Sequence, residues 1–141
     1  MVGTPVNPPQ WGTPLGYANA MRMDAFLLLA GQVGGDPDGK GRHRIVAGGF
    51  VAQFQKALEN VVEVVKAAGG APEDVLELTI YVTSMPEYRA ARRDLGPAWK
   101  RVMGSHYPAM TLVAVSELFE EDAVVEIRGV AAVGGPRGKG R

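Results

Sequence analysis

The chain has 141 residues, 46% hydrophobic and 21% charged, which is ordinary usage for one globular domain that can bury a core. Its 15 Lys and Arg residues balance its 15 Asp and Glu residues, so no net charge attracts nucleic acid or an anionic membrane over long range. The absence of cysteine excludes disulfides and thiol catalysis, and with no signal-like or membrane-spanning apolar run we expect a single cytoplasmic domain that spans residues 1–141.

The N-terminal part predicts an arm followed by a β-hairpin. Residues 1–16 are rich in Pro and Gly and should form an extended or looped arm, which Trp11 anchors to the body of the protein. Residues 17–30 then predict two strands, the second almost wholly apolar (AFLLLA), with Met23 and Asp24 as the turn between them.

The next stretch, GQVGGDPDGKG at residues 31–41, is expected to be a loop because Gly, Asp and Pro break regular structure. Its glycines do not have the spacing of a phosphate-binding loop. His43, just beyond it, is expected to be solvated.

Two helices and a strand follow. Apolar residues recur at helical spacing and predict a helix over about residues 49–68, with Gly69 and Gly70 ending it. Residues 75–82 (VLELTIYV) alternate as a strand does. A second helix is predicted from Pro86 to about Met103, and the Gly-Pro pair at residues 96–97 should kink or interrupt it.

The last stretch contains the first candidate functional residues. A short apolar run at residues 112–115 and a strand at residues 125–133 are joined by an acidic turn. Glu126 and Arg128 fall on one face of the second strand among small apolar side chains, where a charge needs a partner, a ligand or water. The basic, Gly-rich end, residues 134–141, is expected to be a flexible tail.

The predicted order is therefore β-β-α-β-α-β-β, an α+β fold with two helices on one face of a mixed sheet. Two helices cover one face only, and the last strand is apolar on both faces. We therefore expect the other face of the sheet to contact another subunit in an oligomer.

Several ordered motifs between Pro14 and Val133 carry a family resemblance: PLGYANA, LLAGQVGGDP, ALENVVEVVKAAGGAPEDVLELTIYVTSM, HYPAMTLVAV and VEIRGVAAV. In this order they resemble the reactive intermediate deaminase (Rid, or YjgF) family. The resemblance implies the chorismate mutase-like fold and a homotrimer with a central barrel and three clefts between subunits. It also implies hydrolysis, without a cofactor, of enamines and imines from pyridoxal-phosphate enzymes to a 2-oxo acid and ammonia.

The resemblance also implies roles for individual residues. Glu126 stands at the position of the glutamate that positions water, Tyr17 at that of the N-terminal tyrosine, and Gly31 at the turn glycine; the backbone of Leu112 matches the strand position. The family arginine that holds the substrate carboxylate is Met110 here. A thioether cannot form the paired hydrogen bonds of a guanidinium, a loss of about 1.5–3 kcal/mol or more, so altered substrate specificity is predicted.

Arg128 leaves two interpretations open. It is either a relocated anion clamp or a structural partner of Glu126, and the second is favoured because it requires no ligand. Burial would raise the pKa of Glu126 and a neighbouring Arg128 would lower it. No metal site is expected, since the two histidines, His43 and His106, lack metal-ligand spacing.

Three functions remain under consideration. The first is an enamine/imine hydrolase of altered specificity. The second, motivated by Met110, is a non-catalytic trimer that binds a small metabolite in the same clefts. Nucleic-acid binding is the weakest, because the charge is balanced and no basic-aromatic patch is present.

Overall fold

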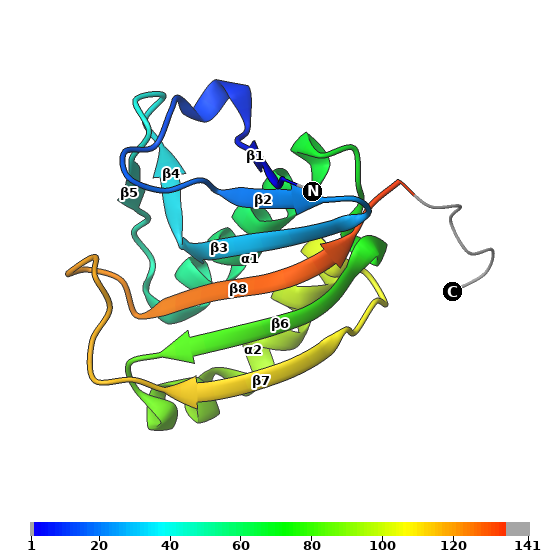
Figure 1. The fold of residues 1–141 in the computed structure, drawn as a ribbon. Coiled ribbons are helices and arrows are strands. Elements are labelled where there is room, and N and C mark those ends of the chain that lie inside the picture. Colours follow the sequence, from blue (N-terminus) through cyan, green and yellow to red (C-terminus); the bar gives the residue numbers. More distant parts are fainter. Residues whose placement is uncertain (1, 135–141) are drawn as a thin grey trace.

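The computed structural model describes residues 2–134, in which helices and strands follow the predicted order with additions in the N-terminal third (Figure 1). The strands and helices are β1 (Thr4–Val6), β2 (Ala20–Met23), β3 (Phe26–Val33), β4 (Gly35–Pro37), β5 (His43–Ile45), α1 (Gly49–Ala67), β6 (Val75–Val82), α2 (Met85–Met103), β7 (Ala109–Ala114) and β8 (Val125–Ala132). Short 3-10 helices lie at Pro9–Trp11 and Pro72–Asp74.

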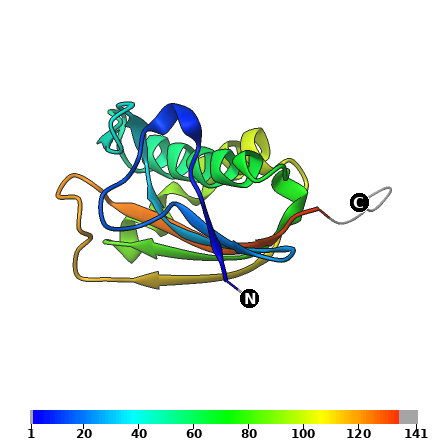
Figure 2. The ribbon, with the colours of Figure 1, turned by 45° about the horizontal axis from the view of Figure 1, so that its top comes forward.

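One six-stranded sheet has the order β1-β2-β3-β8-β6-β7, and β4 and β5 form a separate small hairpin. All pairs in the large sheet are antiparallel except β6 with β7, which is parallel. Both helices pack on one face of this sheet and leave the other face open (Figure 2). The predicted α+β architecture with two helices on one face of a mixed sheet is therefore confirmed.

The core lies between the helices and the sheet, as the two periodicities require. Alternate residues of the central strands point toward the helices, and the apolar stripe of α1 meets them. The fully buried members include Leu27, Leu58, Val61, Val65, Leu78, Val82, Val125 and Ile127. Neither helix of the described part is long and apolar enough to cross a membrane.

The last two strands do not pair with each other, although the sequence places them on either side of one turn. β8 lies between β3 and β6, and β7 is the edge strand beside β6. The alternately buried side chains of β8 explain its central place, since a central strand buries more surface than an edge strand. The segment from Val115 to Val124, between β7 and β8, is therefore a crossing loop, called the β7–β8 loop below.

The predicted loop at residues 31–41 is partly wrong. β3 continues to Val33 after a bulge between Leu29 and Gln32, because Gln32 and Val33 pair with Ile127 and Glu126 of β8. The rest folds into the β4–β5 hairpin. The N-terminal arm is also more ordered than expected, since β1 pairs with β2, and the predicted anchor Trp11 is confirmed at 3% exposure.

The second helix is not interrupted at the Gly-Pro pair, as α2 runs through Pro97. Proline removes one backbone hydrogen bond there, but the neighbouring Leu95, Ala98 and Trp99 are buried and hold the helix in place. The predicted flexible tail lies outside the described residues from position 135 onward.

Candidate functional site

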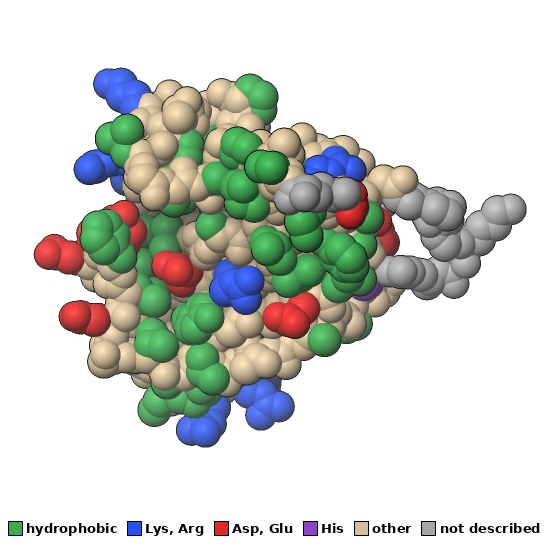
Figure 3. Space-filling model, in the orientation of Figure 1, with side chains coloured by type: hydrophobic (Ala, Val, Ile, Leu, Met, Phe, Trp, Pro, Cys, Tyr) green, Lys and Arg blue, Asp and Glu red, His purple; other side chains and the backbone are tan. Residues whose placement is uncertain are grey.

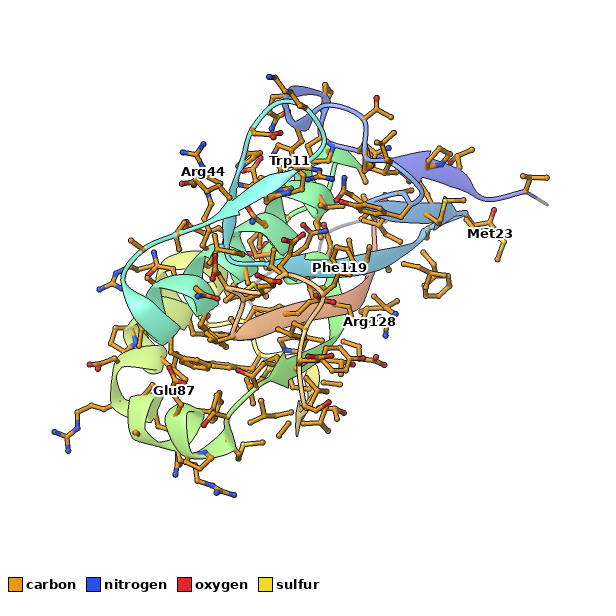
Figure 4. All side chains as sticks on the ribbon, turned by 90° about the vertical axis from the view of Figure 1, so that its left-hand side faces the viewer. Trp11, Met23, Arg44, Glu87, Phe119 and Arg128 are labelled. Atoms are coloured by element: carbon orange, nitrogen blue, oxygen red, sulfur yellow. The ribbon has the colours of Figure 1, made fainter. Side chains whose placement is uncertain are left out.

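A pocket of about 630 Å³ opens at the end of the sheet where β3 finishes and β8 begins. The N-terminal arm, the end of β3, the tip of the β4–β5 hairpin and the β7–β8 loop enclose it. Figure 4 views the molecule from this end, with Phe119 on the β7–β8 loop. The lining residues are Leu15, Tyr17, Asn19, Ala30, Gly31, Gln32, Val33, Lys40, Gly41, Arg42, His43, Phe119, Glu120 and Glu126.

Glu126 and Gly31 are in direct contact in this pocket. Glu126 is the second residue of β8, and its half-buried carboxylate lies over Gly31 of β3. A Cβ at Gly31 would stand 2.7 Å from Glu126 Cδ and closer still to Oε2, so only glycine permits this approach. The carboxylate thereby lies against the backbone of the Gly-Gln segment.

Two causes raise the pKa of the Glu126 carboxyl above its usual value: first its burial, then the negative charge of Glu120. The same two causes raise the pKa of the Tyr17 phenol, so Tyr17 remains a hydrogen-bond donor at neutral pH. The site thus pairs a carboxyl group that holds its proton more tightly than usual with a protonated phenol.

Within one chain, Arg128 is not the structural partner of Glu126 that the sequence favours. Both residues lie in the described part of the chain, and no ion pair joins Arg128 to Glu126. The ion pair between Lys56 Nζ and Asp36 Oδ1, at 3.3 Å, lies elsewhere, between α1 and the β4–β5 hairpin. The expectation that Arg128 lowers the pKa of Glu126 is wrong, since the two causes of its shift are burial and Glu120.

A buried amide network forms the floor of the pocket. The Asn19 backbone N and Nδ2 donate to Asn7 Oδ1 at 2.9 and 3.0 Å, and Gln32 Nε2 donates to Asn19 Oδ1 at 3.2 Å. Asn19 and Gln32 are 3% and 4% exposed. Because a buried amide without a partner is costly, these bonds fix the segments that carry Tyr17 and Gly31.

The tip of the β4–β5 hairpin lies on another side of the pocket. His43 was expected to be solvated, and this is wrong: its ring meets Trp11 edge to face with centroids 4.6 Å apart. Its Nε2 is buried and has no hydrogen-bond partner among the described residues. Burial lowers the pKa of His43, so the imidazole is uncharged at neutral pH.

The remaining predicted site residues lie elsewhere in the chain. Met110 and Leu112 belong to the edge strand β7, where they pair with Leu78 and Ile80, whose side chains face the helices. Glu126 extends from the opposite face of the sheet. A single chain therefore brings together Tyr17, Gly31 and Glu126 but keeps Met110, Leu112 and Arg128 outside the pocket.

His106 lies in the loop that leads into β7, outside the pocket, and its contacts are structural. His106 Nε2 lies 2.7 Å from the Val75 carbonyl oxygen, and the His106 carbonyl accepts from Trp99 Nε1 at 3.0 Å.

Sequence reasoning missed Glu120, Lys40 and Arg42, all of which line the pocket. The acidic run at residues 120–122 is visible in the sequence, but by itself it predicts only a turn. Lys40 and Arg42 gave no comparable signal, because charges in a Gly-rich segment usually mark a solvated loop.

The family model described as Endoribonuclease L-PSP matches residues 12–133. A RutC family protein of Pyrococcus horikoshii is 31% identical over 119 residues, 84% of this chain and 88% of its own. A goat (Capra hircus) protein named 2-iminobutanoate/2-iminopropanoate deaminase is 29% identical over 84% of this chain and 80% of its own. The solved structure of RidA from an Antarctic Psychrobacter has a TM-score of 0.77 at 24% identity and covers 92% of this chain and 99% of its own.

Proposed function

The chain belongs to the endoribonuclease L-PSP family, which is the reactive intermediate deaminase (Rid, YjgF) family, and from this premise we propose that it is an enamine/imine hydrolase that releases ammonia. The observation that carries the proposal is the Glu126 carboxyl held over Gly31 beside Tyr17 in one pocket. The goat relative named as an imine deaminase supports the same reaction type.

Glu126 serves this reaction in both of its protonation states. As an acid it delivers a proton to the carbon of an enamine and gives the iminium ion. As the resulting carboxylate it takes a proton from water while the water oxygen bonds to the iminium carbon, giving a carbinolamine. Glu126 then gives the proton it took from water to the nitrogen, and the C–N bond breaks as an oxygen lone pair forms the carbonyl. Ammonia leaves, and the hydroxyl proton passes to the Glu126 carboxylate, which restores the acid. A raised pKa suits a group that must hold and return this proton near neutral pH.

The proposed site includes a second subunit. Met110 and Leu112 lie on β7, an edge strand with β6 on one side only among the described residues. A neighbouring copy of this strand would bring Met110 and the Leu112 backbone to the pocket of the next chain, in a homotrimer with the cleft between subunits. Since Met110 supplies no charge, we propose a substrate specificity that differs from that of relatives with arginine there. The lack of cysteine supports a cytoplasmic location for this reaction.

The first experiment measures ammonia release from imines generated in situ from several amino acids. We expect the wild type to accelerate release and Glu126→Gln to reduce the rate about 10²–10⁴-fold, because Gln neither donates nor accepts the proton. Glu87→Gln is the matched control, as Glu87 is an exposed carboxylate in the first turn of α2, on the other side of the sheet and outside the pocket. An unchanged rate in Glu126→Gln would refute the proposed role.

Met110 favours one alternative function, a trimer that binds a small metabolite in the same clefts without catalysis. In that case the wild type would release no ammonia beyond the uncatalysed rate, whereas Met110→Arg would restore the missing charge and gain activity. Ammonia release by the wild type that Glu126→Gln abolishes would exclude this alternative.

A further inference from the structure

The charged residues of the pocket are divided between two of its walls. Lys40 and Arg42 come from the β4–β5 hairpin, whereas Glu120 and Glu126 come from the β7–β8 loop and the start of β8. Figure 3 shows Lys and Arg side chains over the hairpin at the upper left and Asp and Glu side chains below them. A ligand in this pocket therefore meets positive charge at one end and negative charge at the other.

The hairpin tip is held rigidly. Asp38 Oδ1 accepts hydrogen bonds from the backbone N–H groups of Lys40 and Arg42, at 2.7 and 3.1 Å, and these bonds lower the pKa of the Asp38 carboxyl. The backbone N of Gly41 donates to the Trp11 carbonyl at 2.8 Å, which fastens the tip to the N-terminal arm. The two positive side chains therefore project from a fixed backbone rather than from a loose loop.

The charge of Lys40 helps to lower the pKa of Asp38, but among the described residues neither cation has a direct side-chain partner. Within residues 2–134, no ion pair or side-chain hydrogen bond engages the Lys40 ammonium or the Arg42 guanidinium. The neighbouring His43 lines the same wall, and its buried Nε2 has no partner within that range. A buried polar atom without a partner is uncommon, and either a water molecule or a ligand in the pocket can satisfy it. Arg44 is exposed on the same hairpin but does not line the pocket.

We propose that Lys40 and Arg42 form an anion subsite that replaces the guanidinium missing at Met110. The substrate is then an imine that carries a carboxylate. Its nitrogen lies toward Glu126 and Glu120, and its carboxylate lies toward the hairpin tip, where a guanidinium and an ammonium form charge-assisted hydrogen bonds with it. This inference rests on the proposed function and assigns the residues that hold the substrate carboxylate in place of the family arginine.

The test compares two substrates of similar size, one with a carboxylate and one with an uncharged carboxamide at the same position. Ammonia release is measured for a 2-imino acid and for the imine of the matching amino-acid amide, which has no carboxylate. In the Lys40→Gln/Arg42→Gln double variant we expect KM for the 2-imino acid to rise about tenfold or more. KM for the amide should stay unchanged, and kcat should change little for both substrates. Arg44→Gln is the matched control and should behave like the wild type.

Two outcomes of this comparison would overturn the inference while leaving the hydrolase intact. One is an unchanged KM for the 2-imino acid in the double variant. The other is an equal loss in Arg44→Gln, which would mean that any positive charge on the hairpin has the same effect.

A binding measurement separates this inference from the proposed function. Isothermal titration calorimetry follows 2-oxobutanoate, a 2-oxo acid of the product class, with wild type, the double variant and Arg44→Gln. If no imine is hydrolysed, the proposed function fails, but binding that is lost only in the double variant still supports the anion subsite. Binding that is equal in all three proteins, or absent from the wild type, overturns it. Both side chains are exposed, so the double variant should keep the wild-type circular dichroism spectrum.

Discussion

Glu126 is a common type of residue in an uncommon environment. It is half-buried at the start of a strand whose other residues are mostly apolar, and its pKa is raised by burial and by Glu120. Tyr17, Lys40, Arg42 and His43 complete the titratable and charged groups around it. The segments that surround its carboxyl therefore come from distant parts of the sequence, whereas the like charge that raises its pKa comes from the adjacent β7–β8 loop.

Replacement of Glu120 by Gln should make Glu126 a stronger acid. Removing the like charge lowers the pKa of Glu126, so the ionised base persists to lower pH. We expect the acid limb of the pH profile of kcat/KM for ammonia release to move to lower pH in Glu120→Gln. Glu121→Gln removes an adjacent carboxylate that does not line the pocket and should leave the limb in place. If kcat/KM of Glu120→Gln falls at the same acidic pH as that of the wild type, this fall does not reflect the ionisation of Glu126.

Replacement of Gly31 by Ala should reduce catalysis without unfolding the protein. The added Cβ overlaps the Glu126 carboxylate, which must rotate away because it is the end of a flexible side chain. A displacement of about 1 Å can cost about 10²-fold, so we expect kcat to fall by about that factor with little change in Tm. Gly96→Ala is the control, since a Cβ there meets nothing within 4 Å. Full activity in Gly31→Ala would mean that the position of the carboxylate over residue 31 is not needed.

Among the elements, helix α1 determines where the β7–β8 loop lies. Gln53 is 6% exposed on α1, and its Nε2 donates to the Asp122 carbonyl at 3.0 Å. Its Oε1 accepts from the backbone N of Val124 at 2.9 Å. One buried amide therefore holds two backbone groups in the middle of the segment that leads from Glu120 to Glu126.

We expect Gln53→Met to loosen this loop. The change leaves a carbonyl and an N–H without their partner, at a cost of about 1–3 kcal/mol in the free energy of unfolding measured with urea. Amide hydrogen exchange at Val124 should become faster, and kcat for ammonia release should fall with Glu126 less well positioned. Gln55→Met is the control, because Gln55 bonds only Arg101 at the surface among the described residues. Wild-type exchange at Val124 would contradict the role assigned to Gln53.

At the scale of the whole molecule, the open face of the sheet carries apolar side chains that one chain leaves exposed to solvent. Figure 3 looks onto this face and shows hydrophobic side chains spread across the strands. Those at least 40% exposed include Met21, Met23, Phe26 and Leu28. Contiguous apolar surface of this kind usually marks a contact with another protein, and it supports the proposed trimer.

A charge placed on this face should dissociate the proposed trimer. Leu28→Glu introduces a carboxylate that the interface would bury without a partner, which is strongly unfavourable. By sedimentation equilibrium we expect the wild type to have three times the mass of the 15.0 kDa chain, and the variant to have the mass of a single chain. Ala90→Glu, at an exposed position of α2 on the other side of the sheet, should remain assembled. A wild type that sediments as a single chain would refute the trimer.

The sequence alone determined most of the elements, since their signals are local. Apolar and polar residues alternate over residues 75–82 and recur at helical spacing after Phe50, and each pattern indicates which side of the element is buried. The structure confirms β6 and α1 at those places. The family motifs likewise located Tyr17, Gly31 and Glu126.

Only the tertiary structure decided which elements are neighbours and which charges share the pocket. Strand pairing depends on contacts distant in the chain, so no local pattern indicated that β8 lies between β3 and β6. Glu120, Lys40 and Arg42 resemble solvated loop residues in the sequence because their role depends on the same long-range contacts. Side-chain periodicity specifies which surface an element buries, whereas the free energy of the whole packed chain specifies what that surface is buried against.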